Sequence, residues 1–183
     1  MTCHRLLLLA DMNVPLHVWD RELGLRFRNL FRSCWDRVPA DVRQAVLFFW
    51  GSKGDGVLPR AEFSDVWGDS HCSCGQVRYS GLEMRFSESA FRALLGPGRT
   101  QVNTVEAAAF VIAHELAHVY QKALGFRPGG INEADNEAEA DEFATSWGFD
   151  DSLFRAIQLV AQEHGDDFEY ACKTINSLGG ESS

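Results

Sequence analysis

Seven consecutive apolar residues directly precede two histidines that are four positions apart. The run covers Ala107 to Ala113 and leads into His114-Glu115-Leu116-Ala117-His118. A helix that is apolar at every position has no face to offer to water, so it must be buried. The chain is therefore expected to fold around this helix. The histidines and the glutamate at its end then need partners inside the protein.

The spacing of these polar residues fits a metal site. Residues four apart lie on one side of a helix, so both imidazoles can reach a single ion. Glu115 lies beside them but is angled away, which suits a group that holds a water molecule and does not bind the metal. Zinc lowers the pKa of such a water, and a carboxylate can take its proton as the water attacks a carbonyl. The pattern predicts one catalytic Zn²⁺ ion bound by His114 and His118, with Glu115 as general base.

A catalytic zinc usually has three protein ligands and one open position, so a further ligand is expected. The next predicted helix carries Glu137 and Asp141, which are four apart and share a face. Glu137 is the predicted third ligand, and Asp141 is predicted to accept the other ring N–H of a metal-bound histidine. Glu133 is the alternative ligand, but only Glu137 places Asp141 in register for that bond. Glu139 is expected on the far, solvated side.

The two motifs together resemble those of the gluzincin metallopeptidases. The string from Glu137 to Ala144, E-x-x-A-D-x-F-A, is similar to the second motif of minimal bacterial gluzincins, including the ImmA/IrrE-like peptidases. Asn136, Glu137 and Asp141 also match a string of the thermolysin-like enzymes. The resemblance covers about residues 103–148. It implies a zincin-like fold, hydrolysis of peptide bonds in a protein or peptide substrate, and His114, His118 and Glu137 as zinc ligands, with Glu115 as base and acid.

Two further features follow from this resemblance. Gluzincins have a strand above the active helix that pairs with an extended substrate, and the alternating segment Leu82–Ser87 is the candidate for it. Gluzincins also often stabilise the oxyanion with a downstream Tyr or His, for which His164 and Tyr170 are the available groups. A surface histidine at a helix end is the simpler interpretation of His164.

The loop segment that contains His71, Cys72 and Cys74 allows two interpretations. It could bind a second zinc, or one thiolate could cap the catalytic zinc and keep the protein latent. The C-x-C spacing differs from the C-x-x-C pair that is usual for structural zinc, so an ordinary loop with two thiols is the simpler interpretation.

Two alternative functions remain open. The chain could be a regulatory metalloprotein that acts on one specific partner in a stress or phage response and shows little general proteolysis. It could also be a non-catalytic zinc-binding domain, in which a fourth protein ligand would close the open position.

The composition limits the number of domains, the partners and the cellular location that can be expected for this chain. The chain has 183 residues, which fits one domain, and its 17 Lys and Arg against 26 Asp and Glu leave a net charge of −9. Too few cations are present to neutralise nucleic-acid phosphates. The odd number of cysteines is a poor disulfide framework, and the apolar run Leu6–Ala10 is too short for a signal peptide or a membrane span. A cytoplasmic protein without a membrane partner is expected, and its oligomeric state is left open.

The expected fold is α+β, a single zincin-like domain over residues 1–183 with a small sheet packed on the central helix. N-terminal helices occupy 1–50, the sheet 57–87, the active-site helices 103–148 and the C-terminal helices 151–178. Helices are expected at 15–38, 40–50, 103–124, 133–147, 151–164 and 167–178, and strands at 57–67, 76–80 and 82–87. Asn103 is the expected N-cap of the central helix and Gly125 its expected stop.

Overall fold

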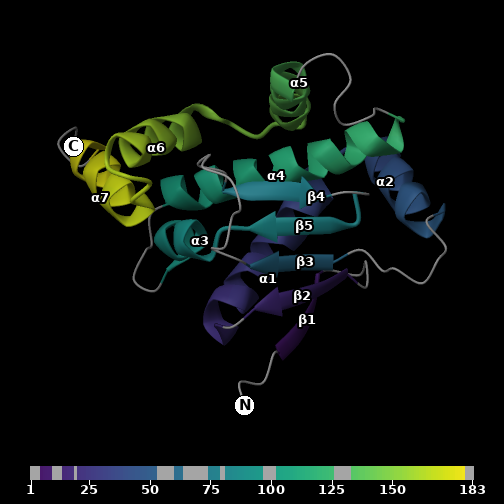
Figure 1. The fold of residues 1–183 in the computed structure, drawn as a ribbon, viewed down its shortest axis with the longest axis horizontal. Helices are drawn as coiled ribbons and strands as arrows, with labels where there is room; N and C mark the ends of the chain where they lie inside the picture. Colours follow the sequence, from purple (N-terminus) through teal and green to yellow (C-terminus); the bar gives the residue numbers. More distant parts are fainter. Residues whose placement is uncertain are drawn as a thin grey trace.

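The computed structural model describes residues 5–9, 14–18, 20–52, 60–63, 74–78, 81–96, 102–125 and 133–179. Helices and strands alternate irregularly along the chain, as expected for an α+β protein (Figure 1). The strands are β1 (Arg5–Leu9), β2 (Val14–Val18), β3 (Arg60–Phe63), β4 (Gly75–Arg78) and β5 (Glu83–Phe86). The helices are α1 (Arg21–Arg37), α2 (Ala40–Ser52), α3 (Glu88–Leu95), α4 (Val102–Ala123), α5 (Glu133–Ser146), α6 (Ser152–Glu163) and α7 (Phe168–Gly179).

The strands form one mixed sheet in the order β1-β2-β3-β5-β4. The central pairs β2–β3 and β3–β5 are parallel, and the outer pairs β1–β2 and β5–β4 are antiparallel. Strands β3 and β5 alternate strictly: one face carries buried Ala61, Phe63, Met84 and Phe86, and the other carries paired charges such as Arg85 with Glu62. The sheet therefore packs its apolar face against the helices.

Helix α4 runs along the β4 edge of the sheet and is the centre of the fold (Figure 1). It contacts α1, α2, α3, α5, α6 and β4. No residue from Ala107 to Ala113 is more than 3% exposed, so the prediction of a buried helix is confirmed. Gly125, at φ +86°, follows this helix, and the predicted C-terminal stop is also confirmed.

The prediction that residues 1–50 are helical and that the sheet lies within 57–87 is wrong, because β1 and β2 belong to the sheet, and several element boundaries differ as well. The helix predicted from residue 15 begins only at Arg21, because Val14–Val18 pair with strands on both sides and form β2. Asp20 caps the new start by accepting hydrogen bonds from the backbone N–H groups of Glu22 and Leu23 at 2.8 and 3.2 Å. Helix α4 begins at Val102, so Asn103 lies within it and is not the N-cap. Helix α2 continues through Gly51 to Ser52.

Helix α3 had no counterpart in the prediction. Ser87 caps it by accepting from the backbone N–H of Ala90 at 3.2 Å. The ring of Phe91 packs into an aromatic cluster with Phe27, Phe63 and Phe86, with ring centroids 5.2 to 5.7 Å apart. Burial of this ring holds in place an eight-residue helix that is too short to be stable alone.

None of the helices in the described ranges has the length and hydrophobicity that a membrane-spanning segment requires.

Candidate metal centre

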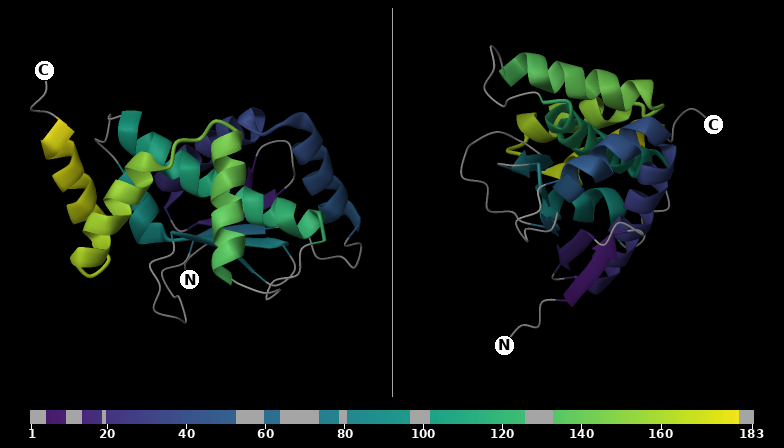
Figure 2. Two further views of the ribbon diagram at one scale, coloured as in Figure 1. Left: turned by 90° about the horizontal axis from the view of Figure 1, so that it is seen from above. Right: turned by 90° about the vertical axis from the view of Figure 1, so that its right-hand side faces the viewer.

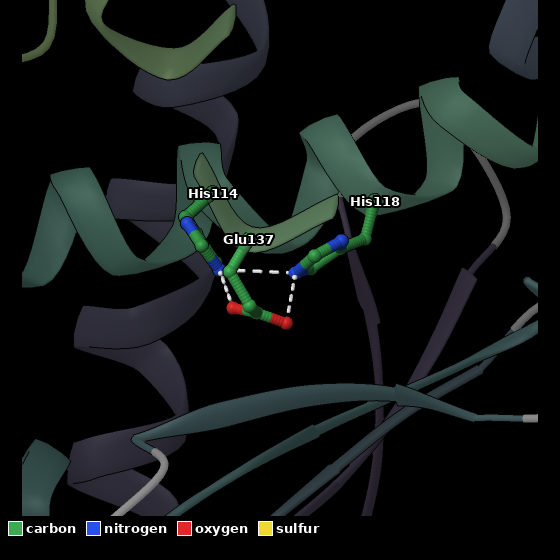
Figure 3. A group of neighbouring side chains, drawn as sticks. All are labelled: His114, His118 and Glu137. Atoms are coloured by element: carbon green, nitrogen blue, oxygen red, sulfur yellow. Dashed lines mark hydrogen bonds and ion pairs between the residues drawn. The ribbon is translucent and has the colours of Figure 1, made fainter. Parts of the chain in front are cut away.

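Three side chains from two helices converge on one point. His114 and His118 project from α4, and Glu137 projects from α5, which crosses α4 (Figures 2 and 3). The Nε2 atoms of the histidines are 3.0 Å apart. The carboxylate of Glu137 approaches them with one oxygen 3.1 Å from His114 Nε2 and the other 3.3 Å from His118 Nε2. In the described part of the chain, these three residues form the group whose donor atoms could bind a metal ion.

The spacing of these donor atoms fits zinc. Zinc binds imidazole nitrogen and carboxylate oxygen at about 2.0–2.1 Å in a tetrahedron, so neighbouring ligand atoms are about 3.3 Å apart. The two Nε2 atoms are 3.0 Å apart, and each lies 3.1 or 3.3 Å from a different oxygen of Glu137, which is close to this value. Two imidazoles and one carboxylate are also a ligand set of catalytic zinc.

Asp141 holds the outer nitrogen of His114. Its Oδ1 is 2.8 Å from His114 Nδ1, which leaves Nε2 directed at the group. Asp141 is held in turn by Arg155 of α6, whose Nη2 donates to Oδ2 at 2.6 Å. The structure thus brings Glu137 and Asp141 to the two nitrogens of one histidine, in the register expected from their spacing. No local pattern in the sequence relates Arg155 to this site, so spacing alone does not predict its contact with Asp141.

Gln121 holds the outer nitrogen of His118. Its Oε1 is 2.9 Å from His118 Nδ1, and its Nε2 donates to Glu139 at 3.0 Å. The prediction that Glu139 lies on the solvated far side of its helix is wrong, because this residue is half-buried and contacts Gln121 of α4. The sequence signal for Gln121 is its position three residues after His118, which places both on one face of α4.

Glu115 is buried beside the two histidines, with only 3% of the residue exposed. Its Oε2 has no hydrogen-bond partner among the described residues. Burial raises the pKa of Glu115, although the nearby histidines oppose this effect. Strand β4 packs closely against the carboxylate: a Cβ atom on Gly75 would lie 2.5 Å from its Oε1. A buried carboxylate with an unsatisfied oxygen is expected to have a polar partner such as water or a substrate.

His164 and Tyr170 lie elsewhere. Their rings contact each other, with centroids 4.2 Å apart, where α6 ends and α7 begins. The structure does not bring them into the group around His114, and both are exposed.

Of the remaining candidate ligands, some lie outside the described residues and one lies next to β4. His71, Cys72 and the side chain of Glu133 lie outside the described residues. Cys74, directly before β4, is buried and does not belong to the group of possible metal ligands.

The charge state of the metal-free site leads to a pH prediction. Burial lowers the pKa of His114, but hydrogen bonds to Asp141 and Glu137 outweigh it and raise the pKa to about 10. Protonation of His114 therefore stabilises the metal-free fold, fully below its unfolded pKa of about 6.5, and this stabilisation is lost as the pH rises through 10. Zinc binds only the deprotonated imidazole, so zinc affinity should change in the opposite direction and rise with pH.

Proton release tests this prediction directly. Zinc titration calorimetry at pH 7, in two buffers with different ionisation enthalpies, should show that protons are released on binding. Asp141→Asn should release fewer, because the neutral amide no longer raises the pKa of His114. Equal heats in both buffers would contradict the prediction.

Comparisons with protein-family models, with curated proteins and with solved structures found no match for this chain.

Proposed function

We propose that this chain is a zinc-dependent peptidase with a zincin-like fold. The observation that carries the proposal is the convergence of His114, His118 and Glu137 at zinc-ligand spacing beside the buried carboxylate of Glu115. Ligand spacing alone would suit a structural zinc equally well. A buried carboxylate with an unsatisfied oxygen next to the ligands is what a hydrolytic site needs in addition, because it can exchange a proton.

The number of ligands is compatible with catalysis, because a zinc ion with three protein ligands keeps one coordination position for water. Among the described residues, the group has three ligands, which matches the catalytic arrangement with one open position. When bound, zinc would lower the pKa of a water molecule and polarise the substrate carbonyl. Glu115 would take the proton of the attacking water, and the same carboxyl would then donate it to the departing amine. Burial, which raises the pKa of Glu115, helps it to hold that proton between the two steps.

The sheet supports an extended peptide as substrate, but at a different strand from the one expected. The segment Leu82–Ser87 contains β5, which is paired with β3 on one side and β4 on the other, so it cannot accept another strand. The edge strand next to α4 is β4. A peptide that adds to β4 by main-chain hydrogen bonds would pass close to Glu115, because Gly75 of this strand packs against its carboxylate.

Gly75→Ala tests this geometry. The added methyl group would meet the Oε1, Cγ and Cδ atoms of Glu115 at 2.5 to 2.7 Å, so the strand or the carboxylate must move. Misplacement of a catalytic group by about 1 Å can lower the rate about 100-fold, and we expect a loss of this order with unchanged zinc content. Gly51→Ala is the matched control, because a Cβ there meets nothing within 4 Å. Equal activity in both variants would argue against β4 as a wall of the site.

The proposal as a whole is tested by elemental analysis of the purified protein together with cleavage of casein and of a mixed library of quenched fluorescent peptides. We expect about one zinc per chain and cleavage that stops on chelation and returns with zinc. Protein that neither contains zinc nor binds it after reconstitution would refute the proposal.

A further inference from the structure

Gln121 is a buried amide that contacts both helices of the metal centre. It lies on α4 one turn after His118, and only 4% of the residue is exposed. Besides the contacts with His118 and Glu139, its Nε2 donates to the backbone carbonyl of Asn136 at 2.9 Å. Asn136 directly precedes Glu137 in α5. One side chain therefore contacts the ring of one candidate ligand and the backbone next to another.

The chemistry of its partners determines how the amide is oriented. The carbonyl of Asn136 and the carboxylate of Glu139 accept hydrogen bonds, so the NH₂ group of Gln121 must face them. Its oxygen then faces Nδ1 of His118 and can only accept. Nδ1 must carry the proton, which leaves the lone pair of Nε2 free for a metal ion. Nε2 is the nitrogen that faces His114 and Glu137.

The two histidines are thus held by different kinds of acceptor. His114 is held by the carboxylate of Asp141, whose charge is balanced by Arg155. His118 is held by the neutral amide of Gln121. A neutral acceptor orients the ring of His118 without placing a second negative charge against the carboxylate of Glu139, which accepts from the same amide.

We propose that Gln121 is the positioning residue of this metal centre: its one amide sets the tautomer of His118 and holds the backbone beside Glu137, so that ligands from two helices meet. The inference rests on the proposed function, because it concerns the same site. It goes further by assigning the assembly of that site to a residue that is not itself a ligand.

Gln121→Met is the main test, because methionine has a similar length and makes no comparable hydrogen bonds. We expect zinc affinity to fall about 10- to 100-fold, as for other residues that orient metal ligands. The visible d–d bands of the cobalt-substituted protein should also change, because the ring of His118 is no longer fixed. Glu139→Gln is the matched control. It keeps an acceptor for Gln121, so zinc affinity and the cobalt spectrum should stay unchanged.

A paired exchange separates positioning from folding. Gln121→Glu alone would place a carboxylate against that of Glu139 and weaken zinc binding. Combining it with Glu139→Gln removes this repulsion, but a carboxylate at position 121 still cannot donate to the carbonyl of Asn136, so we expect only partial recovery of affinity. Circular dichroism monitors folding, and if Gln121→Met does not fold, the paired exchange decides.

Three outcomes would overturn the inference. The first is wild-type zinc affinity and cobalt spectrum in Gln121→Met. The second is a fall in thermal stability of that variant without a spectral change, which would mark Gln121 as purely structural. The third is full recovery of affinity in the paired exchange, which would mean that the bond to the carbonyl of Asn136 does not help to hold the ligands. None of these three outcomes affects the proposed function as long as the wild-type protein binds zinc. If the wild-type protein binds no zinc, both proposals are refuted.

Discussion

Glu115→Gln is expected to keep zinc and to lose peptide cleavage by about 10²- to 10⁴-fold, the range that a general acid–base contributes. The amide has the shape of the carboxylate but cannot take a proton from the attacking water. Because burial disfavours the charged form of Glu115, the substitution removes a buried charge and should not destabilise the fold. Single-turnover cleavage, with zinc content measured on the same samples, gives the comparison.

The matched control is Glu106→Gln, the same exchange on the same helix. Glu106 is half-exposed and pairs with Arg37 at 3.5 Å, a surface contact that contributes about 0–1 kcal/mol. This variant should cleave at the wild-type rate. Cleavage by Glu115→Gln at a rate similar to that of the control would rule out Glu115 as the proton acceptor.

Glu137→Gln is expected to abolish the stabilisation of the fold by zinc. At a zinc concentration about 1,000 times the dissociation constant, binding adds about 4 kcal/mol to the stability of the wild-type protein. For a chain of 150–250 residues, this corresponds to a rise in Tm of about 8–16 °C. The variant would lose one of the three proposed ligands, which come from both α4 and α5, so its Tm should rise little when zinc is added.

Glu142→Gln provides the control, because Glu142 is an exposed acid of the same helix α5. Thermal unfolding of all three proteins, with zinc and with chelator, measures the effect. A zinc-dependent shift in Glu137→Gln as large as that of the control would exclude Glu137 as a ligand.

Much of the site could be anticipated because helix geometry is local. Which residues share a face depends only on the 3.6-residue repeat, so the pair His114 and His118 and the pair Glu137 and Asp141 could be recognised from spacing. The burial of α4 followed in the same way from its uniformly apolar composition.

Pairing between distant segments could not be anticipated in this way. The alternating pattern of Leu82–Ser87 predicted a half-buried strand correctly, but it does not tell which neighbours that strand has. Only the fold shows that β5 is interior and that β4 forms the edge beside α4. Similarly, His164 and Tyr170 were candidates by residue type, yet the packing of α6 against α7 keeps their rings together and outside the site.

The sequence by itself therefore determined the buried helix and the face that carries His114 and His118, because both depend on contacts within one or two helical turns. Only the tertiary structure decided how that face is completed. Helix α5 crosses α4 so that Glu137 meets the histidines, and β4 packs against Glu115. Gln121 holds the ring of His118, and Arg155 holds the carboxylate of Asp141. These relations join residues from separate elements, and their geometry depends on how the whole core packs, which no local pattern records.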